Sequence, residues 1–253
     1  MPELNGGDPF ASDLPLVTYS GGTPDTDFSA QPLFKTVHAR QWASLIRPYC
    51  EEAPLPVVEN AVRYAAIQFC ERTRAWRYIV SASFEENNEV IIAPDYATIH
   101  EIENAWWNDS VELVPTQFTE ALPEDLNATE PIGTPRYITQ MSPNTVTVLP
   151  LGEGTLRLTV FLKPRSGHDF VRATTEPIHD YYDQVPEFLF VQWGEVIAWG
   201  ALARILMLPR KEWSDAERAV YFERKFEAAM DSKSSMAIQG QQRSKRRANI
   251  HFY

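Results

Sequence analysis

The sequence predicts an α+β fold: an antiparallel helical bundle that carries an inserted antiparallel β-sandwich or barrel-like unit, with extended arms at both ends. Three observations predict it. Helical hydrophobic patterns precede residue 77 and follow residue 177, strand-like runs lie between them, and neither end of the chain shows hydrophobic periodicity. With 253 residues, of which 44% are hydrophobic, the chain can build a substantial core. The expected parts are an N-terminal arm at 1–36, a bundle from 37–76 and 178–231, a β unit at 77–177 and a basic tail at 232–253.

Two helices are expected before the β unit. The pattern of His38–Arg47 predicts the first, which Pro48 ends. Residues 56–75 predict the second, because apolar residues recur at i, i+3, i+4 and i+7 and the helix starts at a proline, which lacks an N–H where none is needed. We expect this segment to supply the following residues to the bundle core: Val58, Ala61, Val62, Ala65, Phe69 and Trp76.

The middle of the chain reads as short strands separated by turns. Residues 77–84 (RYIVSASF), the turn-like EENNE and then VIIAP predict a hairpin. Further strand-like runs are Ile99–Trp106, Val111–Phe118, Arg136–Met141, Thr145–Leu149 and Thr155–Leu162. The last alternates apolar with polar or small residues, which is typical of a half-buried strand. Trp106 and Trp107 should point to opposite faces of their strand, so one of them is a candidate for an exposed interface aromatic.

Two further helices are expected after the β unit. Residues 186–208 predict the first, in which Ala198, Gly200 and Ala201 would allow another helix to approach closely, and Pro209 ends it. Ser214 and Glu217 fit a capping box at the start of the last helix. The core residues expected from this pair are Ile197, Ala201, Ile205, Val220 and Phe226.

No motif in the sequence points to catalysis, so we expect no enzyme, no catalytic residues, no cofactor and no metal site. The five histidines have neither HExxH nor other metal-ligand spacing, and the sequence has no nucleophile elbow, Walker A loop or GxGxxG. Adjacent carboxylates arise by chance among 34 acidic residues, although a glycosidase-type pair that meets only in space stays open. Cys50 and Cys70 are expected to be buried free thiols, with a disulfide as the alternative. We expect no signal peptide and no membrane span, since no apolar run approaches roughly 20 residues.

The charge of the chain is uneven. The net charge is −11, but the residues from Ser232 onward carry five positive charges and no acid, which leaves −16 on the rest. The basic and aromatic residues near the C-terminus are Arg243, Lys245, Arg246, Arg247, Phe252 and Tyr253. This tail could bind phosphates, could be a solvated tail, or could dock on an acidic protein surface. We favour docking, because a purely electrostatic tail has no need of aromatic end residues.

Three segments together resemble one protein family. EAPLPVVENAVRYAAIQFCERTRAWRY, at 52–78, resembles the N-terminal helix signature of phage head-to-tail adaptor (connector) proteins of the short-tailed type. The matching positions are Phe69, Cys70, Arg72, Thr73 and Trp76. The β-rich middle is similar to the family's inserted sandwich, and GALARILMLPRKEWSDAERAVYFERKF resembles its closing helical pair. The resemblance covers roughly residues 37–230.

The resemblance implies a structural virion protein at the head–tail junction, assembled in the bacterial host cytoplasm. Such adaptors form a ring with other copies of themselves, generally twelve, between the portal protein and the tail nozzle, and they line the channel through which phage DNA leaves. The family's C-terminal extension grips the portal, which makes the six tail residues above candidates for portal contact. An acidic body would suit a channel wall, because like charge keeps DNA from sticking. The alternatives are a neck or head-completion protein of a long-tailed phage, a glycan-binding or glycan-cleaving tail protein, and a nucleic-acid-binding protein that uses the basic tail.

Overall fold

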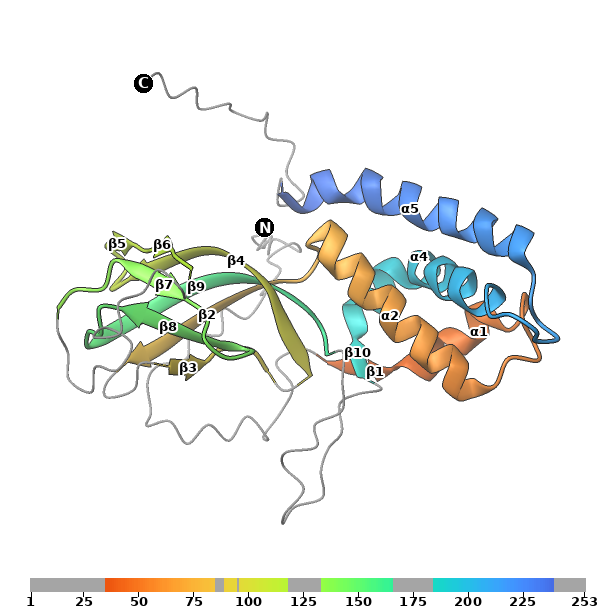
Figure 1. Cartoon of the computed structure of the whole chain (residues 1–253), viewed down its shortest axis with the longest axis horizontal. Coiled ribbons are helices and arrows are strands. Elements are labelled where there is room, and N and C mark those ends of the chain that lie inside the picture. Colours follow the sequence, from red (N-terminus) through yellow and green to blue (C-terminus); the bar gives the residue numbers. More distant parts are fainter. Residues whose placement is uncertain (1–34, 85–88, 95, 118–132, 166–183, 239–253) are drawn as a thin grey trace, which may run out of the picture.

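The structure is a computed structural model that describes residues 35–84, 89–94, 96–117, 133–165 and 184–238. It is a mixed α+β fold, as the sequence predicts, with the helices gathered at one end and the two four-stranded sheets at the other (Figure 1). The helices are η2 (Ala39–Trp42, 3-10), α1 (Ala43–Ile46), α2 (Leu55–Thr73), α4 (Glu187–Leu206) and α5 (Ala216–Ile238). The strands are β1 (Thr36–His38), β2 (Arg77–Phe84), β3 (Glu89–Ile91), β4 (Ala97–Trp107), β5 (Val111–Glu112), β6 (Val114–Pro115), β7 (Tyr137–Thr139), β8 (Thr145–Leu149), β9 (Gly154–Pro164) and β10 (Gln184–Pro186).

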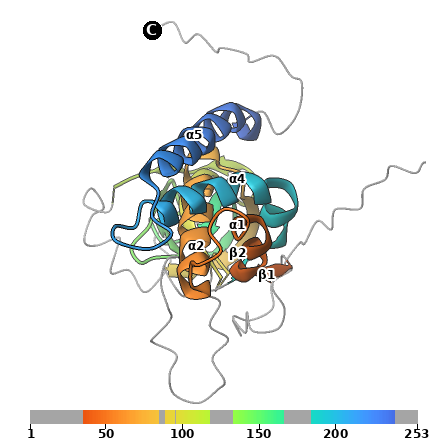
Figure 2. The same cartoon turned by 90° about the vertical axis from the view of Figure 1, so that its right-hand side faces the viewer.

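The long helices α2, α4 and α5 pack on one another, and Figure 2 shows them side by side. The closest approach is at Gly200 of α4, where an added Cβ atom would lie 2.8 Å from the ring of Phe226 on α5. A small residue is therefore needed at this crossing, as the sequence predicts for this part of the chain. Trp42 of η2 joins the same core, and its indole N–H donates to the carbonyl of Gly194 at 3.0 Å.

Helix α4 is the most apolar of the three. By length and composition it could cross a membrane, but half of its apolar stretch is buried inside the protein. It packs against both α2 and α5, so its apolar character has a structural cause in the protein core.

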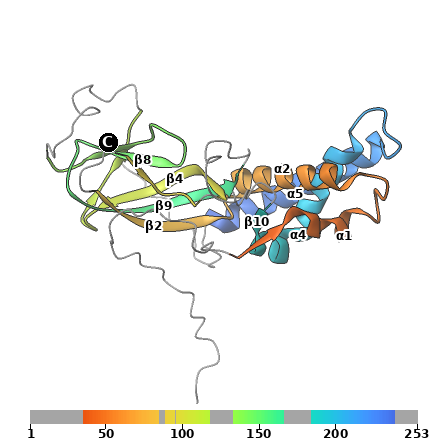
Figure 3. The ribbon, with the colours of Figure 1, turned by 90° about the horizontal axis from the view of Figure 1, so that it is seen from below.

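The β unit contains two four-stranded sheets, with strand orders β2-β9-β4-β5 and β3-β8-β7-β6. Strand β9 is central to the first sheet, and Figure 3 shows β8 lying over β4 and β9. The alternation predicted for β9 is confirmed, because its inward residues are fully buried: Leu156, Leu158, Val160 and Leu162. A separate two-stranded sheet pairs β1 with β10 and ties the residues before η2 to the start of α4.

Two details of the predicted strand pairing are wrong. Strands β2 and β3 do not form a hairpin, since β2 pairs with β9 and β3 pairs with β8 in the other sheet. An eight-residue ladder to β9 offers β2 more backbone bonds than the three residues of β3 can. The β unit is also not purely antiparallel, because Val114 and Pro115 of β6 pair in parallel with β7.

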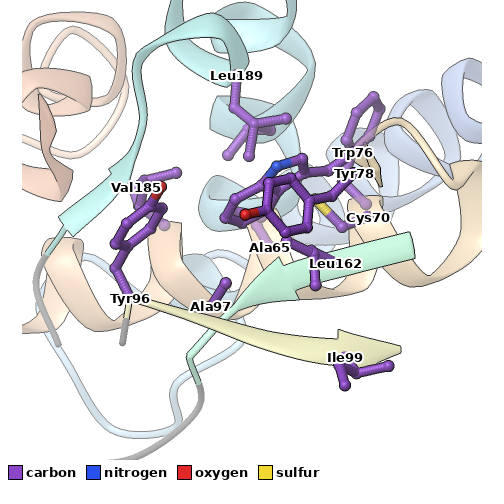
Figure 4. Packing of buried hydrophobic residues seen from close by; sticks show 14 of the residues in the cluster. Ala65, Cys70, Trp76, Tyr78, Tyr96, Ala97, Ile99, Leu162, Val185 and Leu189 are labelled. Carbon is purple, nitrogen blue, oxygen red and sulfur yellow. The ribbon is translucent and has the colours of Figure 1, made fainter. Parts of the chain in front are cut away.

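Trp76 joins the helical end to the sheets. It is 1% exposed, and its ring stacks on Tyr96 at 6.0 Å between centroids and meets Phe188 edge-on at 6.2 Å. Figure 4 shows Trp76 among side chains from α2, β9 and α4, including Cys70, Leu162 and Leu189. Because helices and sheets share this core, β9 packs against α2 as well as against its neighbouring strands β2 and β4.

Helix α5 differs from its prediction at both ends. Its N-terminal cap is Asp215, whose Oδ1 accepts the backbone N–H of Arg218 at 3.0 Å. Ser214 is not the cap: its hydroxyl donates to the carbonyl of Leu208 and accepts the N–H of Lys211, which closes the turn before the helix. At the other end the helix runs to Ile238, past the expected start of the tail at residue 232.

Candidate functional site

The structure describes all eleven residues expected in the bundle core, and ten of them are buried. These ten are Val58, Ala61, Val62, Ala65, Phe69, Trp76, Ile197, Ala201, Ile205 and Phe226. Val220 is the exception and was placed wrongly, since it is 36% exposed. Helix α5 turns the face formed by Ala219, Phe222, Phe226 and Met230 toward its neighbours, and Val220 lies one residue, or about 100°, away from Ala219.

The six candidates for portal contact lie outside the described residues. They are Arg243, Lys245, Arg246, Arg247, Phe252 and Tyr253.

Among the described residues, no group of three or more His, Cys, Asp or Glu side chains could hold a metal ion. Cys50 and Cys70 are both buried and free, as expected, and desolvation raises the pKa of each thiol, so neither is an activated nucleophile.

The carboxylates on the outer face of the β2-β9-β4-β5 sheet are paired with arginines. The Oε2 atom of Glu101 lies 2.7 Å from Nη2 of Arg74, and the Oε1 atom of Glu103 lies 2.8 Å from Nη2 of Arg77. The two guanidinium groups also lie over the ring of Phe161, at 5.7 Å and 5.2 Å from its centroid. This network covers an aromatic ring with charge and needs no substrate to explain it.

The charge of the described part differs from the expected acidic body. Of the 34 acidic residues, 16 lie outside the described residues, as do 5 of the 23 basic residues, so the described part carries 18 of each. The excess of acid therefore lies in segments outside it, with five acids and no base in residues 1–34. The idea that an acidic body faces DNA has no support from the described part.

One surface stands out along α5, where basic side chains lie over aromatic rings. The Nζ of Lys225 lies 4.7 Å from the ring centroid of Trp199 and 5.2 Å from that of Tyr221. Seven residues earlier, which is two helical turns, the guanidinium of Arg218 lies 5.8 Å from the ring of Tyr49. We call these five residues the α5 surface.

The α5 surface is both exposed and well supported. Tyr221 is 55% exposed and Tyr49 is 47% exposed. Each packs edge-on against the buried Phe222, at 5.4 Å and 5.3 Å between centroids. Cations over aromatic faces contribute about 0.5–1 kcal/mol each at exposed sites, which holds the rings in place. Ordered Tyr, Trp and Arg side chains are the residues in which protein interfaces are enriched.

An exposed tryptophan lies on strand β4 of the β2-β9-β4-β5 sheet. Trp106 is 37% exposed and its neighbour Trp107 is 2% exposed, which confirms that they point to opposite faces. Trp106 lies opposite Arg157 of β9 in the strand register. The Nη1 atom of Arg157 forms an ion pair with Oδ1 of Asp109 at 3.5 Å.

Sequence reasoning missed the α5 surface, although part of its signal was available. The seven-residue spacing of Arg218 and Lys225 places both on one side of a helix. Tyr49 lies in the connection before α2, and only the tertiary structure brings it beneath Arg218.

No protein-family model matches the chain, and no curated protein matches it.

Proposed function

We propose that this protein is a structural component of a phage virion, a head-to-tail adaptor that forms a ring between the portal and the tail. One observation supports the proposal most: α2 and α4 pack together although β2 to β10 lie between them in the chain. A helical unit split by a β insertion is the arrangement that the resemblance implies. In this proposal α2, α4 and α5 form the bundle and the two four-stranded sheets form the inserted sandwich.

Contact between neighbouring copies is assigned to the α5 surface. A ring needs two different surfaces on each copy, because its contacts are head-to-tail. The rigid aromatics Tyr49 and Tyr221 can supply one of them at low entropic cost.

Contact with the portal is assigned to the C-terminal tail, and phage DNA passes through the ring without being bound. The protein is assembled into the virion in the host cytoplasm, and it acts at the head–tail junction. This role needs no catalytic group, cofactor or metal.

Electron microscopy of the purified full-length protein, mixed with the portal protein of the same phage, tests the proposal. We expect rings seated on the portal, with uniform symmetry in class averages. A chain that stays monomeric and binds no portal at micromolar concentration contradicts an adaptor. A ring that binds a tail-tube protein and leaves the portal bare supports a neck protein of a long-tailed phage instead.

A second candidate function is glycan binding by the β unit, which the exposed Trp106 favours. Aromatic rings on a sheet face can stack on sugars, and Arg157 and Asp109 beside it could donate and accept hydrogen bonds. Glycan-array binding that Trp106→Ala abolishes would support it. Absence of any glycan signal, together with rings on the portal, rejects it.

A further inference from the structure

The outer face of the β2-β9-β4-β5 sheet carries two exposed apolar side chains. Residues opposite one another in the strand register share a face, so Ile79 lies beside Thr159 of β9. By the same rule Trp106 lies between Arg157 of β9 and Glu112 of β5. Ile79 is 54% exposed and Trp106 is 37% exposed. Large apolar side chains that reach solvent on one flat face are typical of a contact with another molecule.

One charge on this face is left without a partner. Arg157 is paired with Asp109, and the carboxylates of Glu101 and Glu103 are paired with arginines. Glu112 is exposed, and it has no ion-pair partner in the part of the chain that the structure describes. The face therefore presents one unpaired carboxylate directly beside an exposed tryptophan.

The α5 surface has the opposite charge. It contains two cations, Arg218 and Lys225, and only Arg218 forms an ion pair, with Asp215 at 3.9 Å. Among the described residues Lys225 has no ion-pair partner, and its Nζ lies 5.2 Å from the ring centroid of Tyr221. Two α5 surfaces placed together would oppose like charges. The charge of the α5 surface therefore fits a surface that carries an acid, rather than a second copy of itself.

The two surfaces also agree in size. On α5, Arg218 and Lys225 are seven residues apart, which is about 10 Å along the helix. On the sheet, Ile79 lies two strands and two residues from Trp106, which is about 12 Å. Figure 1 shows β5 and the start of α5 at opposite ends of the molecule, so the two surfaces can meet only between two copies.

We propose that the outer face of the β2-β9-β4-β5 sheet receives the α5 surface of a neighbouring copy. Lys225 of one copy pairs with Glu112 of the next, and Tyr221 packs against Trp106. The other end of the α5 surface then lies near Ile79. This inference rests on the proposed ring, because it names the second surface that head-to-tail contacts require.

A charge swap tests this contact. Self-association of the full-length protein is measured by sedimentation velocity, alone and with the portal protein of the same phage. Lys225→Glu and Glu112→Lys should each weaken association by about tenfold, because each places like charges opposite one another. The double variant Lys225→Glu/Glu112→Lys restores opposite charges and should associate within about threefold of the wild type. An equimolar mixture of the two single variants should also recover, because alternating copies again join opposite charges.

The matched control is Lys225→Glu/Glu153→Lys. It has the same net charge as the double variant, but it changes an exposed acid in the turn before β9. Its association should stay as weak as that of Lys225→Glu alone. A melting temperature near that of the wild type shows that each variant is folded.

Three results would overturn the proposal: single variants that associate like the wild type, a double variant that stays weak, and a control that recovers as well as the double variant. If the wild type still forms rings in these cases, only this contact is wrong and the proposed function stands. A wild type that assembles neither alone nor on the portal rejects the ring and this contact together. Unchanged association of Trp106→Ala, with loss of glycan binding, would assign the face to a sugar instead.

Discussion

At Gly200 the backbone of α4 lies against the ring of Phe226, and this contact sets the spacing of the helices. A methyl group there would meet ring atoms at 2.8 to 2.9 Å, so the ring or the helix must shift. In Gly200→Ala, overpacking should lower the free energy of unfolding by about 1–3 kcal/mol. The higher helix propensity of alanine should offset about 1 kcal/mol of that loss.

Gly194 of the same helix provides the matched control for urea unfolding. Its added Cβ would lie 3.6 Å from Leu45 and Phe190, which is ordinary contact. Gly194→Ala should therefore be neutral or stabilising by up to about 1 kcal/mol. If Gly200→Ala is as neutral or stabilising as Gly194→Ala, α4 and α5 do not touch closely at Gly200.

The buried thiol of Cys70 makes the free energy of unfolding depend on pH in the alkaline range. Burial raises the pKa of its thiol in the folded state, whereas the unfolded thiol ionises near about 8.5. The contribution of the Cys70 thiol to the free energy of unfolding is fully present below the pKa of the unfolded thiol. It is lost as the pH rises above that pKa, because the unfolded chain then releases a proton that the folded chain keeps. Above about pH 9 this term removes up to about 1.4 kcal/mol per pH unit.

Urea unfolding between about pH 8 and pH 10 checks this effect, with Cys70→Ala as the comparison. The variant lacks the term, so its deficit in unfolding free energy relative to the wild type should shrink as the pH rises. Parallel curves for the two proteins would show that the thiol is not buried as described.

Single residues also show which side-chain positions a sequence pattern can predict and which it cannot. Trp106 and Trp107 were placed on opposite faces by strand geometry alone, and the two differ in exposure as that rule requires. Val220 was misplaced because a helix with apolar residues on several sides does not reveal which of them its neighbours cover.

The elements α4 and α5 are joined by a turn whose chemistry decides where α5 starts. Asp215 caps the helix through its bond from the N–H of Arg218. We expect Asp215→Ala to lower the free energy of unfolding by about 1 kcal/mol, within a range of about 0.5–2 kcal/mol.

Glu217→Ala separates this cap from the capping box that the sequence suggests. With Asp215 as the cap, Glu217 makes no reciprocal bond, and its removal should change stability by less than about 0.5 kcal/mol. A loss of about 1 kcal/mol in thermal or urea unfolding would restore Ser214 as the cap.

Element positions were predicted well, and pairings less well. The bounds predicted for β2 and β8 are those of the structure, because alternation and turn residues are local signals. The partner of β2 is β9, about 70 positions later in the chain, and no local signal carries that choice. Neither the split of 111–118 into β5 and β6 nor the parallel pairing of β6 follows from alternation.

Across the whole molecule, the exposed rings of the α5 surface should matter for assembly and little for folding. Tyr221→Lys replaces a ring that is 55% exposed with a charge beside Lys225. We expect it to weaken self-association at least about tenfold, as loss of an interface hot spot does, with a melting temperature near that of the wild type.

Sedimentation velocity over a range of concentrations measures this effect. Val114→Lys, on the β unit at 56% exposure, is the matched control and should leave association unchanged. If both variants associate like the wild type, the α5 surface is not a contact between copies.

The sequence by itself determined the α+β class, the order helices–strands–helices, and ten of the eleven residues placed in the bundle core. It could do so because hydrophobic periodicity is local and reports which face of each element is covered. The tertiary structure decided the strand partners, the sheet face that Ile79 and Trp106 share, the balanced charge of the described part and the meeting of Tyr49 with Arg218. Those features join residues far apart in the chain, and which of them meet depends on the packing of whole elements.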